Sequence, residues 1–221
     1  MKNSKEIGII ILPDNETCLK ANMLQDSCLV NLEKSGLIKL ATYDKNYRNL
    51  FHMTLYQLLI ESSNLHALCE SIKKISLDLQ SLSFQMNISL TNTHHNIFWN
   101  SDEAKDLISL KKSHEEAITE GNKRRIKSET FSRSQYCKTG QLTAQEILDI
   151  EEYGIFWGLP HNFMPHITVI YNLNCDKNNI RIRDCLDEVQ MESHHLFHAK
   201  SIAIGELGPA GNVTSILEVI Q

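Results

Sequence analysis

The sequence contains one local pattern twice, as Phe51-His52-Met53-Thr54-Leu55 and as Pro165-His166-Ile167-Thr168-Val169. Both segments are short and dense in apolar residues, which is typical of β-strands rather than helices. They hold the only His-x-Thr triplets in the chain. Chance predicts about 0.5 such triplets for this content of His and Thr. The repeated triplet is therefore the feature from which fold and function are best predicted.

Strand geometry gives the repeat a physical meaning, because side chains two positions apart on a strand point to the same face of the sheet. His52 then projects beside Thr54, and His166 projects beside Thr168. The apolar residues of both segments point to the opposite, packed face: Met53, Leu55, Ile167 and Val169. Where two such strands meet across a cleft, two imidazoles and two hydroxyls surround one small space.

This set of side chains fits metal-free phosphodiester chemistry. One imidazole takes a proton from the attacking water or ribose hydroxyl while the other gives a proton to the leaving oxygen. Both tasks are feasible near neutral pH, because free His titrates at about 6.5. The Thr hydroxyls donate hydrogen bonds to the non-bridging phosphoryl oxygens, where charge accumulates in the transition state.

The composition is that of an ordinary soluble globular protein, with 221 residues, of which 42% are hydrophobic and 22% are charged. A chain of this length buries a core without disulfide bonds. The six cysteines show no C-x-x-C spacing, so we expect reduced thiols and a cytoplasmic location. No apolar stretch approaches the ~20 residues of a membrane span, so no membrane partner is expected.

We also expect no metal and no cofactor. His-rich stretches occur at 94–95 and 194–198. Adjacent histidines point to opposite sides of a strand, and no neighbouring Cys or carboxylate set completes a tetrahedral site.

Charge is segregated along the chain. The formal net charge is −5, but residues 122–140 carry six basic and one acidic side chain, so the rest of the chain sums to −10. Affinity for extended nucleic acid comes mainly from Lys and Arg, so an acidic body argues against an extended nucleic-acid surface. We interpret 122–140 as a basic, mobile insertion between two halves. A solvated loop, a nucleic-acid contact and a nuclear-localisation-like patch remain alternatives for it.

Hydrophobic periodicity and turn residues predict an α+β chain of short strands and helices. The predicted strands are 7–12, 38–41, 50–56, 84–90, 96–99, 165–171, 201–207 and 213–220, and the predicted helices are 15–34, 63–79, 102–119, 143–153 and 180–189. Asn15 or Thr17 is expected to cap the first helix. Each half runs strand, helix, strand, strand in outline, so the halves are interpreted as distant structural copies within a single unit, 1–221.

The two motifs resemble the hallmark of the 2H phosphoesterase superfamily, which includes the LigT-like and 2′-5′ RNA ligase-like proteins. The segment 163–169, Phe-Met-Pro-His-Ile-Thr-Val, is similar to that family's Pro-His-apolar-Thr signature. The resemblance extends in outline to Ile97-Phe98-Trp99 with the following helix, and to the closing hairpin with Gly205, Gly208 and Gly211. It implies two pseudo-symmetric lobes, each a small, mainly antiparallel sheet with helices outside, around a central cleft.

The resemblance also implies an activity, namely metal-independent hydrolysis of a 2′,3′-cyclic or 2′-5′-linked nucleotide or RNA end. His52 and His166 become the acid and base, in an order the sequence leaves open, and Thr54 and Thr168 become the phosphate binders. The expected partner is a small nucleotide or RNA end, and the expected state is a monomer.

Three aromatic residues are further candidates for the wall of the substrate cleft: Tyr56, Tyr171 and Trp99. Tyr56 shares the face of Thr54 if the strand alternates regularly, and a packing role is its alternative. Two other functions use the same residues. One is a nucleotide- or RNA-end-binding module without turnover, and the other is RNA 2′-5′ ligation by the reverse reaction.

Overall fold

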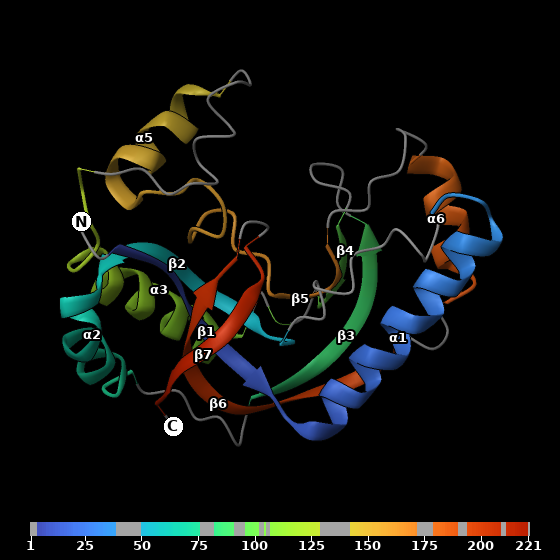
Figure 1. Cartoon of the computed structure of the whole chain (residues 1–221), viewed down its shortest axis with the longest axis horizontal. Coiled ribbons are helices and arrows are strands. Elements are labelled where there is room, and N and C mark those ends of the chain that lie inside the picture. The colour runs from blue at the N-terminus through green and yellow to red at the C-terminus, as the bar shows by residue number, and fades with distance from the viewer. Residues whose placement is uncertain are drawn as a thin grey trace.

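A computed structural model describes residues 4–38, 50–75, 82–90, 96–101, 104, 107–128, 142–171, 179–189, 194–208 and 211–220 (Figure 1). The elements are, in chain order, β1 (Ser4–Pro13), α1 (Asn15–Lys34), β2 (Met53–Glu61), the 3-10 turn η2 (Ser62–Asn64), α2 (Leu65–Ile72), β3 (Ser83–Leu90), β4 (Ile97–Asn100), α3 (Ile108–Asn122), α5 (Ala144–Tyr153), β5 (His166–Ile170), α6 (Asn179–Asp187), β6 (His195–Leu207) and β7 (Val213–Val219). The predicted mixture of helices and short strands is confirmed.

The strands form one antiparallel sheet in the order β1-β2-β5-β4-β3-β6-β7, and β1 also pairs with β6. Six strands therefore close into a ring, and β7 extends it from β6. Figure 1 shows α2 and α3 on one flank of the strands and α1 and α6 on the other. Helix α3 packs on β2, and α1 packs on β5. Because the ring is continuous, the division into two lobes stays a prediction.

Local sequence signals explain where the helices begin. Helix α1 is capped by Asp14, whose carboxylate accepts a hydrogen bond from the backbone N–H of Thr17 at 2.8 Å. This corrects the predicted caps Asn15 and Thr17, because the extended residue that satisfies a free N–H of the first turn is Asp14. Helix α5, predicted over 143–153, has a capping box between Thr143 and Glu146.

Several predicted boundaries change. Helix α2 ends at Ile72 instead of reaching residue 79, and α3 begins at Ile108 instead of near 102. The predicted strand 38–41 lies almost wholly outside the described residues, and so do residues 129–140 of the basic segment.

The described part of the basic segment, 122–128, bonds to the rest of the fold, and the mobility predicted for 122–140 stays a prediction. Arg125 is buried, and its guanidinium donates to the carbonyls of Glu151 and Glu152 at the end of α5, at 2.8 Å each. Arg124 donates to the hydroxyl of Ser71 at 2.6 Å. The acceptors of Arg125 are carbonyls in the last turn of α5, which have no partner within the helix, and a sequence pattern of charges does not reveal such partners.

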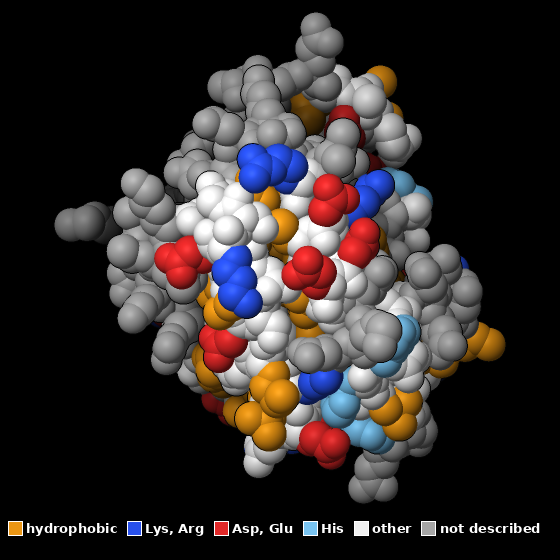
Figure 2. All heavy atoms as spheres, turned by 90° about the vertical axis from the view of Figure 1, so that its right-hand side faces the viewer, with side chains coloured by type: hydrophobic (Ala, Val, Ile, Leu, Met, Phe, Trp, Pro, Cys, Tyr) orange, Lys and Arg blue, Asp and Glu red, His pale blue; other side chains and the backbone are white. Residues whose placement is uncertain are grey.

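The face formed by α1 and α6 carries interspersed acidic and basic side chains (Figure 2). Charges of opposite sign at short spacing screen each other, so this face lacks the single-sign field that attracts polyanions. None of the described helices combines the length and the apolar character that a membrane crossing requires.

Candidate active site

The two motif strands are direct neighbours in the sheet. Strand β2 pairs with β5 in antiparallel fashion, and Met53 lies opposite Ile167. Continuing this register by one residue in each direction sets His52 opposite Thr168 and Thr54 opposite His166. Opposite residues in an antiparallel pair share a face of the sheet. The pairing therefore brings both imidazoles and both hydroxyls to one face, in a two-fold arrangement.

Burial supports this assignment of faces. Met53 and Ile167 are both 0% exposed and belong to the hydrophobic core. On the other face, His52 and Thr168 are buried, whereas Thr54 and His166 are only partly buried. One cross-strand pair of the set, Thr54 with His166, therefore reaches solvent, and the opposite pair, His52 with Thr168, lies deeper. We call His52, Thr54, His166 and Thr168 the His/Thr face.

Both imidazoles are oriented in the same way. His52 Nδ1 lies 2.7 Å from the carbonyl oxygen of Leu50, and His166 Nδ1 lies 2.7 Å from the carbonyl oxygen of Met164. A carbonyl only accepts, so we assign the proton of each neutral ring to Nδ1. Nε2 then carries the lone pair that takes up a proton, which is the state a general base requires.

Burial lowers the pKa of His52 to about 4, from 6.5 for the free side chain, because an imidazolium loses its hydration inside the protein. The Leu50 carbonyl opposes this shift by favouring the protonated ring, and the charge of His166 adds to it. His52 is therefore neutral at pH 7. This corrects the expectation that both imidazoles titrate in the ordinary His range, because the sequence does not show burial.

Each motif strand carries a β-bulge at the residue that follows its threonine. On β1, the consecutive residues Ile9 and Ile10 pair with Tyr56 and Thr54, so Leu55 is the extra residue of β2. In the same way, Ile97 and Phe98 of β4 pair with Ile170 and Thr168, so Val169 is the extra residue of β5. A bulge redirects the side chains around it. The two motifs thus repeat in sequence, in orientation and in backbone irregularity.

The first bulge moves Tyr56 away from the His/Thr face. Tyr56 and Thr54 pair with adjacent residues of β1, so they point to opposite faces of the sheet. Tyr56 is 1% exposed, its ring lies where a Cβ on Gly121 of α3 would sit, and its hydroxyl donates to the carbonyl of Tyr153 at 2.6 Å. The structure gives Tyr56 the packing role and corrects its prediction as a cleft residue, which assumed unbroken alternation.

Trp99 is likewise not brought to the His/Thr face. It lies opposite Ile167 of the packed face and is 0% exposed. Its neighbours take the place predicted for it, because Asn100 lies opposite His166 and Phe98 lies opposite Thr168. The register between β4 and β5 therefore corrects the prediction for Trp99. The residues on either side of it, Phe98 and Asn100, lie beside the His/Thr face instead.

Phe98 is the best-defined contact of His166. The two rings stack with centroids 3.9 Å apart and an angle of 18° between their planes. Phe98 and Asn100 were not predicted as site residues. The alternation of segment 97–100 indicates that Phe98 and Asn100 share a face, but only the pairing with β5 identifies which face that is.

Tyr171 directly follows β5 and is buried, so its role in a substrate cleft stays a prediction. Gln57 occupies the equivalent position after the first motif, and it is also buried. Its amide oxygen accepts a hydrogen bond from the indole of Trp157 at 3.0 Å. Sequence reasoning missed Gln57, because its side becomes clear only when the bulge at Leu55 is known.

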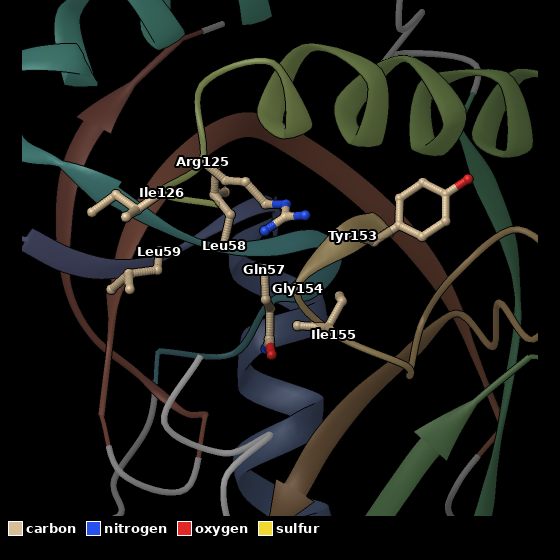
Figure 3. A pocket seen from close by; sticks show the side chains of 8 residues that line it. All are labelled: Gln57, Leu58, Leu59, Arg125, Ile126, Tyr153, Gly154 and Ile155. Atoms are coloured by element: carbon tan, nitrogen blue, oxygen red, sulfur yellow. The ribbon is translucent and has the colours of Figure 1, made fainter. Parts of the chain in front are cut away.

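A small cavity lies beyond Gln57, next to the end of α5. Figure 3 shows its lining side chains, among them Gln57, Arg125 and Ile155. Its volume is about 10 Å³, about the space that a single water needs. None of the four His/Thr side chains lines it, so we assign it to the packing of α5 against β2.

Within the described ranges, no group of three His, Cys, Asp or Glu side chains gathers as a metal site would require. The cysteines at 18, 28, 69 and 185 are free thiols, and those at 137 and 175 lie outside the described residues. Together with Phe98 and Asn100 of β4, the His/Thr face thus presents two imidazoles, two hydroxyls, one aromatic ring and one amide.

Comparison with known proteins gives a distant likeness among solved structures. No family model and no curated protein sequence matches the chain. Among solved structures, the chain is similar to the structure of Kluyveromyces marxianus Usb1, with 13% sequence identity and a TM-score of 0.40, over 98% of this chain and 97% of that one. At this level, the likeness does not identify a function.

Proposed function

We propose that the chain is a metal-independent phosphodiesterase of the 2H type, acting on a 2′,3′-cyclic or 2′-5′-linked nucleotide or RNA end. The observation that carries the proposal is the pairing of Met53 with Ile167. This register sets two imidazoles and two hydroxyls on one face, and each imidazole is held by a backbone carbonyl at Nδ1.

The two histidines differ in environment, and this difference suggests their roles. Buried, neutral His52 is suited to take a proton at Nε2 from the attacking water. The water oxygen then forms a bond to phosphorus, and the bond to the leaving oxygen breaks. His166, the more exposed ring, enters the step as the imidazolium, with Nδ1–H on the Met164 carbonyl, and gives the proton on its Nε2 to that leaving oxygen. Thr54 and Thr168 donate hydrogen bonds to the non-bridging oxygens as negative charge develops on them.

Phe98 and Asn100 extend this face beyond the reacting groups. The ring of Phe98, already stacked on His166, offers a flat apolar surface at the position of the leaving group. Stacking on an aromatic ring contributes about 1–3 kcal/mol per base in single-stranded complexes. The amide of Asn100, opposite His166, is placed to donate to or accept from a ribose or phosphate oxygen.

A turnover assay tests the proposal directly. We expect release of product from 2′,3′-cyclic mononucleotides or from 2′-5′-linked dinucleotides, at an undiminished rate in EDTA. The substrate panel should include 3′-5′-linked dinucleotides and end-labelled RNA incubated in both directions, so that ligation is detected if it occurs. Nucleotide binding by calorimetry with no product from any substrate would instead favour a binding module, which the low exposure of His52 makes a specific alternative.

The pH dependence of kcat/KM reports the state of His52. Protonation of Nε2 blocks the base, so activity falls as pH decreases. Burial lowers the pKa of His52 to about 4, so this limb should lie well below the 6.5 of free His. An NMR titration of the His52 ring should give the same value. An acidic limb at pH 6.5 that follows the His52 resonance would contradict the assignment.

The lowered pKa of His52 also makes the free energy of unfolding depend on pH. Stability must therefore be measured together with kcat/KM at each pH. Because the folded pKa of His52 is lower than the unfolded value, protons bind the unfolded chain preferentially as pH falls from about 6.5 towards 4. Stability is therefore lost in this window. Circular dichroism at each pH separates unfolding from protonation of the active site.

A further inference from the structure

Each bulge in the motif strands leaves a carbonyl that receives a hydrogen bond from outside the sheet. The carbonyl of Leu55 accepts a hydrogen bond from Nδ1 of His114 in α3, at 2.6 Å. The carbonyl of Val169 accepts a hydrogen bond from the side-chain amide of Gln25 in α1. A bulged residue is the one that the strand ladder leaves unpaired. The sheet thus needs a donor at each of these two positions, and a helix supplies it.

The two donors come from opposite flanks of the sheet and are themselves buried. His114 is 0% exposed and Gln25 is 8% exposed. Helix α3 packs on β2, and α1 packs on β5, on the two flanks seen in Figure 1. Burying an imidazole or an amide costs free energy unless it is hydrogen-bonded. The bulge carbonyls that they reach satisfy Nδ1 of His114 and the side-chain NH2 group of Gln25.

His114 also contacts the approach to the second motif. Its ring stacks on Phe163, with centroids 3.8 Å apart and an angle of 12° between the planes. Phe163 lies three residues before His166. One side chain therefore links the bulge that follows Thr54 to the segment that leads into β5. Burial also lowers the pKa of His114 to about 4, so the ring is neutral at pH 7 and we assign its proton to Nδ1.

We propose that His114 and Gln25 are positioning residues, which hold the two bulges and thereby fix where the motif threonines point. This inference rests on the proposed function, in which Thr54 and Thr168 bind the phosphoryl group. Without the donor, the bulge carbonyl is buried and unpaired. The strand then lowers its free energy by returning to a regular register, in which the carbonyl is paired again. A register shift of one residue moves each side chain to the other face of the sheet. The hydroxyl beside the bulge would leave the His/Thr face.

The test compares two variants that lack the donor with matched controls. His114→Leu and Gln25→Met remove the N–H donor and keep a large side chain, whereas His114→Gln restores an N–H donor. The controls are Ser113→Ala, whose hydroxyl donates to Ser109 within α3, and Cys28→Ala, a fully buried position of α1. All are assayed at a temperature at which circular dichroism shows them folded.

We expect kcat to fall by about 10- to 100-fold in His114→Leu and Gln25→Met, since misplacement by about 1 Å costs up to 10²-fold. KM should change by less than about threefold, and His114→Gln should recover most of the rate. The controls should lower the melting temperature without this loss of kcat. A loss of kcat that follows the melting temperature equally in variants and controls would overturn the inference.

A second readout does not depend on turnover. Hydrogen exchange and NMR shifts of the backbone amides of Thr54, Leu55 and Tyr56 should change in His114→Leu and not in Ser113→Ala. The corresponding amides around Val169 should change in Gln25→Met. If the wild-type chain hydrolyses no substrate, the proposed function fails, and these amide signals still decide whether His114 and Gln25 hold the bulges. Unchanged amides would show that they do not.

Discussion

His52→Ala and His166→Ala are each expected to reduce kcat by about 10²- to 10⁴-fold, the range that one positioned acid or base contributes. The reason is that each Nε2 has a separate proton to move, and water in the vacated space is neither oriented nor matched in pKa. Because the two act as a unit, the double variant should lose far less than the product of the two single losses. Steady-state kinetics on the best cyclic substrate measures all three.

Folding must be separated from chemistry in these variants, because His52 is buried and binds the Leu50 carbonyl. His52→Asn retains an N–H donor but no titrating nitrogen, so it should be folded and equally inactive. His194→Ala, at an exposed histidine, is the matched control and should retain full activity. If either motif variant keeps more than about a tenth of the wild-type kcat while folded, the mechanism is wrong.

Thr54→Val and Thr168→Val are expected to lower kcat by about 10²- to 10³-fold each, as the loss of one donor to a developing oxyanion does. Valine keeps the branched shape that a strand prefers and removes only the hydroxyl. The hydrogen bonds strengthen as charge builds up on the non-bridging oxygens, so the loss should fall mainly on kcat.

The conservative exchange tests whether the hydroxyl or the shape is responsible. Thr54→Ser and Thr168→Ser keep the donor and should recover most of the rate. Thr214→Val changes an exposed threonine of β7 and should have no effect. If the valine and serine variants were equally active, the motif threonines would serve packing, and the phosphate-binding role would have to be given up.

Much of the fold follows from local signals. The strands at 166–170 and 213–219, and the helices at 15–34 and 144–153, lie close to where periodicity and turn residues predict them. The strands 53–61 and 195–207 overlap the predicted 50–56 and 201–207, but the first ends later and the second begins earlier than predicted. The box formed by Thr143 and Glu146 depends on residues three apart, so the sequence contains both partners. The end of α5 also depends on the local sequence alone. Gly154 follows the helix with a φ of 82°, which glycine adopts without strain.

The parts that prediction missed depend on partners distant in sequence. Tyr56 was assigned to the wrong face because the bulge at Leu55 appears only when β2 pairs with β1. Phe98 was missed because the register of β4 against β5 decides which residue lies opposite Thr168. The tight bonding of Arg125 was missed because its acceptors lie at the end of α5.

The amino-acid sequence by itself determined the two His-x-Thr strands and the shared face within each of them, since a period of two residues is a property of the strand alone. Only the tertiary structure decided that Met53 meets Ile167, which merges the two sets of side chains into one face. It also decided the state of His52, because a pKa depends on desolvation, and desolvation depends on what the rest of the chain packs around the ring.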